Sequence, residues 1–379
     1  MTATPARPPA SEPKSPGAAL RKALGLPPGT SFTGPLLAIA AVGAALGGAY
    51  AYAAGWLTPE RLTPTAVVKT FNANFGLHPG FRRNHAKGIC VTGYFEGNGS
   101  AAQYSVAPVF GATRTPVIGR FAIPGGNPSI ADAASPVRSL ALLFQLPNGE
   151  QWRTGMNNTP IFIVNNPQAF YANLLASKPD PATKKTDPAK LKAFFDAHPE
   201  SASFRQWIKD HAPSSALTNS SYYGINAFRL VNAAGQQQYV RWSVVPEQVY
   251  VPLDAPAPKD PNFLDEDLQQ QLQQGPVRWH LKLQLAQAGD VTDDATKAWP
   301  DERPMLDAGV LTLNQAIAQG DGPCRDVNFD PLILPKGIQP SRDPLLAARS
   351  AAYSRSFNAR TREEAGGAVQ QAYTQGKTR

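Results

Sequence analysis

Cysteine and histidine are both scarce in this chain of 379 residues, which has 2 cysteines and 5 histidines. Two cysteines are too few for a disulfide framework or for a zinc site with four cysteine ligands. Cys90 and Cys324 can pair with each other if the domain lies in an oxidising compartment, and two unpaired thiols are the alternative. Lysine-rich runs and stripes of basic and aromatic residues are also lacking. The formal net charge of +8 therefore does not indicate a nucleic-acid partner.

Charged residues are missing between Lys22 and Glu60, and this gap contains the apolar stretch Pro35–Trp56. About 20 apolar residues suffice to cross a bilayer as a helix, so we predict a transmembrane anchor over 35–56. The segment 1–34 is rich in proline, alanine and serine and is predicted to be disordered. Its charged residues are mostly basic: Arg7, Glu12, Lys14, Arg21 and Lys22. The positive-inside rule then puts this tail in the cytoplasm and the bulk of the chain on the periplasmic, extracytoplasmic side. The alternative is a cleaved signal sequence, because Ala51–Ala53 resembles a cleavage site.

Short apolar runs closed by Gly, Asn or Pro recur after residue 65 and predict a chain rich in strands. In VRWHLKLQL (277–285), apolar and polar residues alternate, which is typical of a strand with one buried face. Five further runs have the composition of strands: TPVIGRFAI, VRSLALLFQL, TPIFIVN, NAFRLVN and QQYVRWSVV. Helical patterns lie between them and at the carboxyl end: LKAFFDAH, FRQWIKDHA, FLDEDLQQQLQQ and the stretch from Pro344 onward. We predict an α+β fold, with an antiparallel β-barrel and surrounding helices, in one domain over 65–365 and a tail at 366–379.

The last predicted helix carries a tyrosine between two arginines on one face. Arg349 precedes Tyr353 by four residues and Arg360 follows it by seven, so the three side chains project to nearly the same side. A nearby arginine favours the anionic form of a tyrosine. A tyrosine side chain is one of the axial ligands that proteins supply to haem iron. Taken alone, the pattern is more often that of a surface helix with scattered arginines.

Four motifs along the chain together resemble the haem-dependent catalase family, and most closely its smaller members, the catalase-related peroxidases. RRNHAKGICVTGYFEG is similar to the family pattern R-x-x-HAKG-x-x-x-x-GYFE. RTPVIGRFAIPGGNPSIADAASPVRSLALLF is similar to RTPV-x-x-RF followed by AD and R-G-x-A-x-K-F. MNNTPIFIVNNPQAF is similar to NNTP-x-F with a second phenylalanine eight residues on, and the last helix has R-x-x-x-Y. The resemblance covers Thr65 to Arg362 and implies a catalase-like β-barrel that binds haem b (iron protoporphyrin IX).

The resemblance implies a role for each matched residue. His85 would be the distal histidine, which takes a proton from peroxide and returns it, and Asn157 would hold the peroxide. Tyr353 would be the iron ligand, with Arg349 keeping it anionic. Five further residues would bind the cofactor: Arg82, Arg120 and Arg360 at the haem propionates, and Phe162 and Phe170 beside the macrocycle. Arginine forks suit carboxylates that are buried with a cofactor.

Three positions depart from the family pattern. Ala122 stands where full catalases have a serine behind the distal histidine, so the imidazole loses that partner. Asn84 stands where a valine usually covers the haem, which makes the pocket more polar. Asn226 lies near the strand on which typical catalases have a histidine of their NADPH-associated region. The chain also ends soon after the proximal helix, so we expect no flavodoxin-like domain of the kind that large catalases have.

These departures favour a peroxidase that reduces hydrogen peroxide or organic peroxides with a reducing small-molecule donor, and that has weak catalase activity. The enzymatic alternatives are a true catalase and a relative that rearranges fatty-acid hydroperoxides. A non-catalytic haem-binding barrel and a structural envelope protein held by its helix are the alternatives of other classes. The sequence leaves assembly into a homo-oligomer open.

Overall fold

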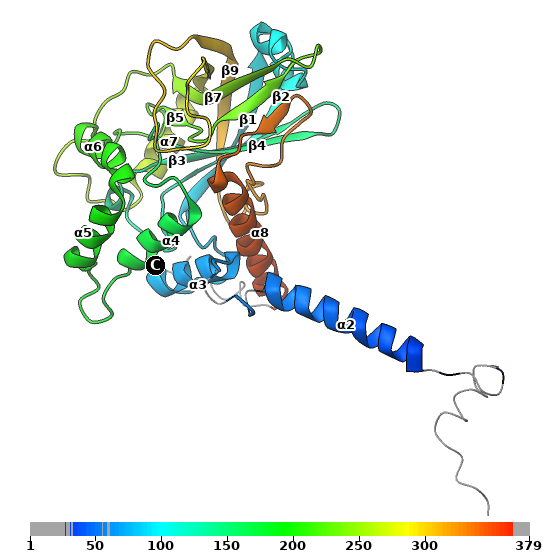
Figure 1. Ribbon diagram of the computed structural model, residues 1–379. Coiled ribbons are helices and arrows are strands. Elements are labelled where there is room, and N and C mark those ends of the chain that lie inside the picture. Colours follow the sequence, from blue (N-terminus) through cyan, green and yellow to red (C-terminus); the bar gives the residue numbers. More distant parts are fainter. Residues whose placement is uncertain (1–26, 28–30, 32, 55, 59–60, 367–379) are drawn as a thin grey trace, which may run out of the picture. The chain divides into compact units, whose positions relative to one another are not determined.

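The computed structural model describes residues 27, 31, 33–54, 56–58 and 61–366 (Figure 1). The chain divides into two units, Met1–Arg61 and Leu62–Arg379. The tails that the sequence predicts at 1–34 and 366–379 lie almost wholly outside the described residues.

The first unit contains the apolar helix α2, Thr33–Ala53. Its 21 residues carry no charged side chain. At 1.5 Å per residue they extend about 31 Å, which matches the hydrocarbon thickness of a bilayer. By length and composition the helix can span a membrane, and a signal sequence meets the same criteria.

Eight antiparallel strands of the second unit form a closed barrel (Figure 1). They follow one another in the order β7–β5–β4–β3–β2–β1–β9–β8, and pairing of β8 with β7 closes the ring. Their bounds are β1 (Gly88–Gly97), β2 (Arg114–Ala122), β3 (Ser139–Gln145), β4 (Gln151–Asn157), β5 (Tyr222–Tyr223), β7 (Gln237–Pro246), β8 (Val277–Leu285) and β9 (Met305–Ala318). Two short strands, β6 (Phe228–Val231) and β10 (Ile338–Pro340), extend the sheet beside β7. The predicted antiparallel barrel is confirmed.

Large apolar side chains fill the barrel interior because alternate residues of each strand point inward. The alternating run in β8 behaves as predicted, with its five apolar residues buried: Val277, Trp279, Leu281, Leu283 and Leu285. Trp152 stacks on Phe144 with ring centroids 4.6 Å apart and meets Trp242 edge-on at 5.0 Å. Trp242 Nε1 donates to Thr154 Oγ1 at 3.0 Å, so its polar atom is satisfied inside the core. Burial of each such side chain stabilises the fold by about 1.5–3 kcal/mol. The barrel is therefore a stable support for a site on its outer face.

Six helices occur in the described part of this unit: α3 (Pro64–Phe75), α4 (Pro167–Ala176), α5 (Pro188–Ala197), α6 (Ala202–Asp210), α7 (Phe263–Gln274) and α8 (Pro344–Ala365). Single 3₁₀ turns lie at Ser100–Gln103, Pro108–Phe110, Asp132–Ala134 and Pro199–Ser201. Helix α8 is capped by Asp343, whose Oδ1 accepts a hydrogen bond from Leu345 N at 2.9 Å. Its first residue is a proline, which is favoured at this position. Helices α3, α4 and α8 pack against one another. The predicted helices at α5, α6, α7 and α8 are confirmed.

The stretch TPIFIVN (159–165) is not a strand, so this element of the sequence prediction is wrong. Pro160 has no N–H for a ladder, and Phe162 N donates instead to Ala295 O at 2.8 Å. Ile161 and Val164 are buried without strand partners. The apolar run therefore reflects packing of an irregular segment between β4 and α4.

Candidate active site

A cavity of about 350 Å³ is lined by the outer face of strands β2, β3 and β4 and by helices α3, α4 and α8. Its volume is in the range of small-molecule and cofactor sites. The structure brings together in its lining all nine residues that the sequence singled out: Arg82, His85, Arg120, Asn157, Phe162, Phe170, Arg349, Tyr353 and Arg360. These residues are up to 278 positions apart, so the fold alone makes them neighbours.

Small side chains make one wall of the cavity flat. Directly paired residues form two rows across the three strands: Arg120–Ala141–Gly155 and Ala122–Ser139–Asn157. A Cβ atom at Gly155 would lie 3.2 Å from Arg349 Nη2 and 3.9 Å from Tyr353 Oη, so the glycine leaves room for both groups. Two rows of small residues with polar groups at their ends can accept the broad face or edge of a planar ligand.

His85 enters the cavity from a tight, left-handed backbone conformation. Its φ is 56°, which is uncommon for a residue other than glycine. Asn84 Oδ1 stabilises this turn by accepting from His85 N at 3.0 Å and from Gly125 N at 2.8 Å. Asn84 lines the cavity, as expected from the family position that it occupies. Its amide oxygen, however, does not face a ligand, because it accepts from the two backbone N–H groups. The departure from valine therefore also shapes the turn that presents the imidazole.

The other residues of the HAKG motif hold this turn against the barrel. Ala86 O accepts from Arg120 Nη2 at 3.2 Å. Lys87 Nζ forms an ion pair with Asp132 Oδ1 at 2.7 Å, and both side chains are largely buried. At Gly88 a Cβ atom would lie 2.6 Å from Arg120 Cζ, so the glycine is required for the guanidinium to pass. The motif thus fixes His85 and Arg120 together.

The imidazole of His85 is neutral near pH 7. Burial is the main reason that its pKa falls from 6.5 to about 3. The positive charges of three arginines lower this pKa further: Arg120, Arg349 and Arg82. Among the described residues neither ring nitrogen has a hydrogen-bond partner, and Nδ1 is wholly buried while Nε2 stays accessible. Ala122 lines the same cavity and has no group to accept from Nδ1, as the sequence suggested.

Asn157 has a partner that the sequence reasoning missed. Ser139 Oγ donates to Asn157 Oδ1 at 2.7 Å from the neighbouring strand. With its oxygen engaged, the amide presents Nδ2 as the group left to donate. A signal was present, because the family pattern R-G-x-A-x-K-F has glycine where this chain has Ser139. The adjacent Asn158 has a structural role instead, since its Oδ1 accepts from Arg138 N at 2.9 Å.

On helix α8, Arg349 and Tyr353 face the cavity as the four-residue spacing predicted. Arg349 Nη2 lies 3.5 Å from Tyr353 Oη, which is a long contact for a hydrogen bond. Arg349 is held more firmly by Gly155 O, at 3.0 Å, and by Asn226 Oδ1, at 2.5 Å. Its charge is therefore fixed beside the phenol by groups other than the phenol.

Asn226 continues this network to a buried carboxyl group. Its Nδ2 donates to Asp343 Oδ2 at 2.7 Å. Burial raises the pKa of Asp343, and hydrogen bonds from Asn226 and Leu345 N and the charge of Arg349 oppose the shift. The sequence noted Asn226 only as a departure from a family histidine. The structure shows that this amide, which cannot titrate, connects Asp343 to Arg349.

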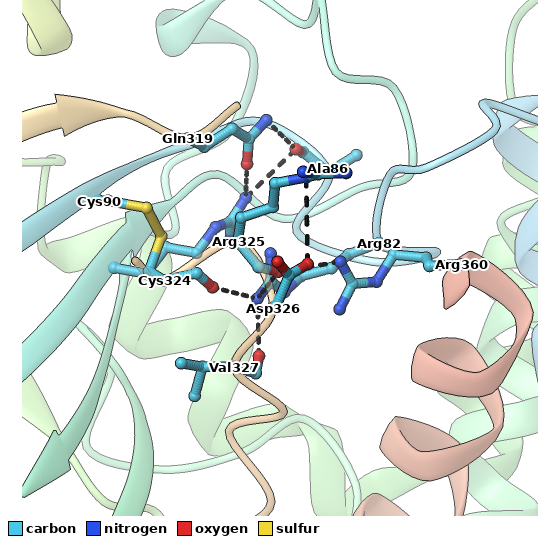
Figure 2. Close-up of a disulfide and its surroundings, with 10 residues drawn as sticks. Arg82, Ala86, Cys90, Gln319, Cys324, Arg325, Asp326, Val327 and Arg360 are labelled. Atoms are coloured by element: carbon cyan, nitrogen blue, oxygen red, sulfur yellow. Dashed lines mark hydrogen bonds and ion pairs between the residues drawn. A yellow bond between two sulfur atoms is a disulfide. The ribbon is translucent and has the colours of Figure 1, made fainter. Parts of the chain in front are cut away.

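Three arginines donate hydrogen bonds to the loop that follows β9, and Figure 2 shows two of them, Arg82 and Arg360, beside it. Arg82 Nη2 donates to Cys324 O at 2.9 Å and to Val327 O at 2.8 Å. Arg360 Nη1 donates to Arg325 O at 3.0 Å, and Arg120 Nη2 donates to Gln319 Oε1 at 2.6 Å. The same loop contains a disulfide between Cys324 and Cys90 of β1, which settles the pairing that the sequence left open.

Phe162 and Phe170 line the cavity together, with ring centroids 5.8 Å apart in a stacked arrangement. Phe170 also lies 6.2 Å from Phe71 of α3. These rings give the pocket an apolar side opposite in character to the arginines. A ligand with an apolar body and an anionic edge would match both.

The residues present fit a haem group. The buried, partnerless imidazole nitrogen, the phenol beside an arginine, the apolar rings and the three arginines form a donor set suited to a planar macrocycle with propionates. Within the described residues no group of three or more His, Cys, Asp or Glu side chains could hold a metal ion directly.

The family model described as Catalase matches residues 80–365. The catalase-related peroxidase of Synechococcus elongatus is 41% identical over 303 residues, which cover 79% of this chain and 89% of that protein. The catalase-related peroxidase of Mycolicibacterium paratuberculosis is 31% identical, with 79% and 95% covered. The catalase of Rattus norvegicus is 30% identical over 71% of this chain, which spans only 54% of that longer protein. Catalase A of Saccharomyces cerevisiae, a solved structure, superposes with a TM-score of 0.68 at 22% identity, over 75% of this chain and 62% of that one, which shows the shared fold.

Proposed function

Because the chain belongs to the catalase family, we propose that it is a haem-dependent peroxidase that binds haem b in the cavity described above. It reduces hydrogen peroxide or organic peroxides with electrons from a small reducing donor. The observation that carries this proposal is the convergence of His85, Asn157 and Tyr353 with three arginines in one cavity. The 41% identity to a catalase-related peroxidase places the chain in the peroxidase branch.

When bound, the haem supplies an iron that exchanges electrons with the peroxide. Tyr353 is the residue that would bind this iron, and Arg349 Nη2 lies 3.5 Å from its Oη. Arg82, Arg120 and Arg360 would hold the propionates, and Phe162 and Phe170 would pack beside the macrocycle: all five line the cavity. Buried propionates need such partners because an unpaired carboxylate is costly away from water.

His85 moves the proton in this mechanism. Because its pKa is lowered to about 3, the imidazole is neutral near pH 7 and would accept a proton from one oxygen of a bound peroxide. Nε2 is its accessible nitrogen. The imidazolium would be strongly acidic in this environment and would give the proton to the other peroxide oxygen. With electrons supplied by the haem the O–O bond would break, and this oxygen would leave as water from hydrogen peroxide or as an alcohol from an organic peroxide. Asn157 Nδ2 orients the peroxide during both transfers.

A spectrum of the purified, haem-supplied protein is the first test. We expect a Soret band with the high-spin features of a tyrosinate-bound ferric haem, and the same preparation should oxidise a phenolic donor when peroxide is added in a stopped-flow instrument. Oxygen release as fast as that of a catalase control would identify a true catalase instead. A colourless protein would contradict haem binding, and a coloured protein inert toward peroxide would indicate a haem carrier. The joint placement of His85 and Asn157 argues against carriage, which needs no acid–base group.

We also propose that α2 anchors the chain in a membrane, with the haem domain at 65–365 on the periplasmic side. Its length and apolar composition support a membrane span, and the buried disulfide is typical of a domain that folds in an oxidising compartment. Alkaline extraction of membranes and protease protection of intact cells test this. Retention of the protein in the membrane pellet with the domain accessible outside is expected, and a soluble protein that begins after residue 53 would indicate a cleaved signal sequence.

A further inference from the structure

The loop Gln319–Val327, here called the arginine-acceptor loop, contacts three arginines from different parts of the chain (Figure 2). Arg82 precedes β1, Arg120 belongs to β2 and Arg360 belongs to α8. The acceptors are the Gln319 side chain and the carbonyl groups of Cys324, Arg325 and Val327. One short loop therefore accepts hydrogen bonds from every arginine that we assign to the haem propionates.

The disulfide attaches this loop to the barrel next to one of those arginines. Cys324 is bonded to Cys90, with the Cα atoms 5.3 Å apart across a sequence separation of 234 residues. Cys90 is the direct cross-strand neighbour of Arg120 in the β1–β2 ladder. The chain packs so closely here that a Cβ atom at Gly322 would lie 2.6 Å from Cys90 Sγ. The bond thus fixes the middle of the loop relative to β1 and β2.

Besides the disulfide and the arginines, the loop is held by turn hydrogen bonds and by side-chain contacts such as Gln319 Nε2 to Ala86 O. Its residues form turns without regular ladder pairing. The apolar cluster around the disulfide is small, with Leu143 and Phe329 as its other buried members. Arg325 Nη2 forms a partly buried ion pair with Glu364 Oε1 of α8 at 2.8 Å. Without the covalent bond, the loop carbonyl groups that accept from the arginines would have to become ordered each time the cofactor binds. The conformational entropy lost in that ordering opposes binding.

We propose that the Cys90–Cys324 disulfide positions the three propionate arginines, so that it acts as a cofactor-retention element and not merely as a stabiliser of the fold. The proposal rests on the haem binding proposed above. Both cysteines are wholly buried, so a reductant has no access to the sulfurs in the folded protein and the bond is a permanent part of the site. A disulfide acts on global stability mainly through the unfolded chain. An effect on haem loss far below the unfolding temperature must therefore come from the native site.

The test compares one chain in two redox states, which keeps every side chain the same. The chain is refolded with haem either in air or with a phosphine reductant, which adds two electrons and two protons to give two thiols, as verified by a mass increase of 2 Da. Haem loss is followed as transfer to excess apomyoglobin at 15 °C, and the unfolding of both haem-free forms is recorded separately. We expect haem to leave the dithiol form about 10-fold faster at a temperature where both forms are fully folded. Equal rates of loss would overturn the proposal.

The arginines provide a matched control. In the Arg82→Ala/Arg360→Ala background, the effect of the disulfide on haem loss should fall to less than about 3-fold, because two of the three arginines that it positions are gone. An undiminished 10-fold effect would show that the bond acts elsewhere. If the dithiol form does not fold, the Gln319→Ala variant of the disulfide form tests the role of the loop instead. We expect this variant to lose haem about 3-fold faster than the parent chain. An unchanged rate of haem loss would contradict the role of the loop. A chain that takes up no haem in either redox state would refute the proposed function itself. Haem that is retained equally well in both redox states would refute only the role of the disulfide.

Discussion

The two sides of the cavity differ in how firmly their functional groups are held. On the tyrosine side, Arg349 is bonded to Gly155 O and Asn226 Oδ1, and Asn226 leads on to Asp343. On the histidine side, the imidazole of His85 has no hydrogen-bond partner among the described residues. On the proposed function, the cofactor would therefore be held by firmly fixed groups on the tyrosine side, whereas the imidazole proposed to transfer protons is oriented by packing and by its left-handed turn. Grip and proton transfer can therefore be separated by mutation.

Tyr353→Phe should have the largest effect, because it removes the proposed iron ligand from the rigid side. We expect most of the haem to be lost and peroxidase activity to fall by at least about 10³-fold. Haem content from the ratio of Soret to protein absorbance, together with far-UV circular dichroism, measures this. Retention of a full-intensity Soret band by a folded variant would contradict the assignment.

His85→Gln should impair the reaction with peroxide on the histidine side and leave haem binding on the tyrosine side intact. Loss of a positioned acid–base group typically costs about 10²–10⁴-fold, so kcat/KM for peroxide should fall by that range while haem content stays normal. Stopped-flow kinetics on a preparation matched for haem content would show it. A simultaneous loss of haem would mean that the two sides are not separable.

The pH profile tests whether the histidine is neutral. With an ordinary pKa of 6.5, about 97% of the imidazole would be charged at pH 5, and peroxide reactivity would drop by about 30-fold from its value at high pH. Because burial and the arginines lower the pKa of His85 toward 3, reactivity should instead change less than 2-fold between pH 7.5 and 5. The same shift destabilises the folded state as pH falls from 6.5 toward 3, since only the unfolded chain binds the proton there. A midpoint near 6.5 that persists with several peroxides would refute the neutral assignment.

Ala122→Ser should orient the imidazole of His85 more firmly, because the serine hydroxyl group can accept a hydrogen bond from Nδ1. A net hydrogen bond contributes about 0.5–1.5 kcal/mol, which predicts a rise of roughly 2- to 10-fold in oxygen release from hydrogen peroxide. Ala122→Val serves as a control for size without a hydroxyl group. An equal rise in both variants would assign the gain to packing.

Ser139→Ala should have the smallest effect, because it frees the amide of Asn157 to rotate without removing it. We expect a roughly 2- to 5-fold weaker affinity for cyanide, a probe that binds where peroxide would, in a spectrophotometric titration. Ser139→Thr retains the hydroxyl group and should restore the affinity. Equal affinities in Ser139→Ala and the parent chain would show that Asn157 is oriented by its backbone alone.

Local patterns predicted several of the elements, and the family motifs singled out nine residues that line one cavity. Alternation in VRWHLKLQL predicted β8 with its buried face, and the spacing of Arg349 and Tyr353 predicted their common helix face. TPIFIVN was predicted wrongly because an apolar run reports burial and not hydrogen bonding. Ser139, Asp343 and Gln319 were missed because each acts on a residue that is close only after the barrel has closed.

The sequence by itself determined which chemical groups are available: a histidine in a tight turn, a tyrosine four residues from an arginine, and an apolar helix ahead of a strand-rich domain. Periodicity and short motifs encode these features because they depend on neighbours within a few residues. Only the tertiary structure decided the state of those groups. The lowered pKa of His85, the anchoring of Arg349 and the joining of Cys90 to Cys324 depend on burial and on contacts between distant segments, which no local pattern specifies.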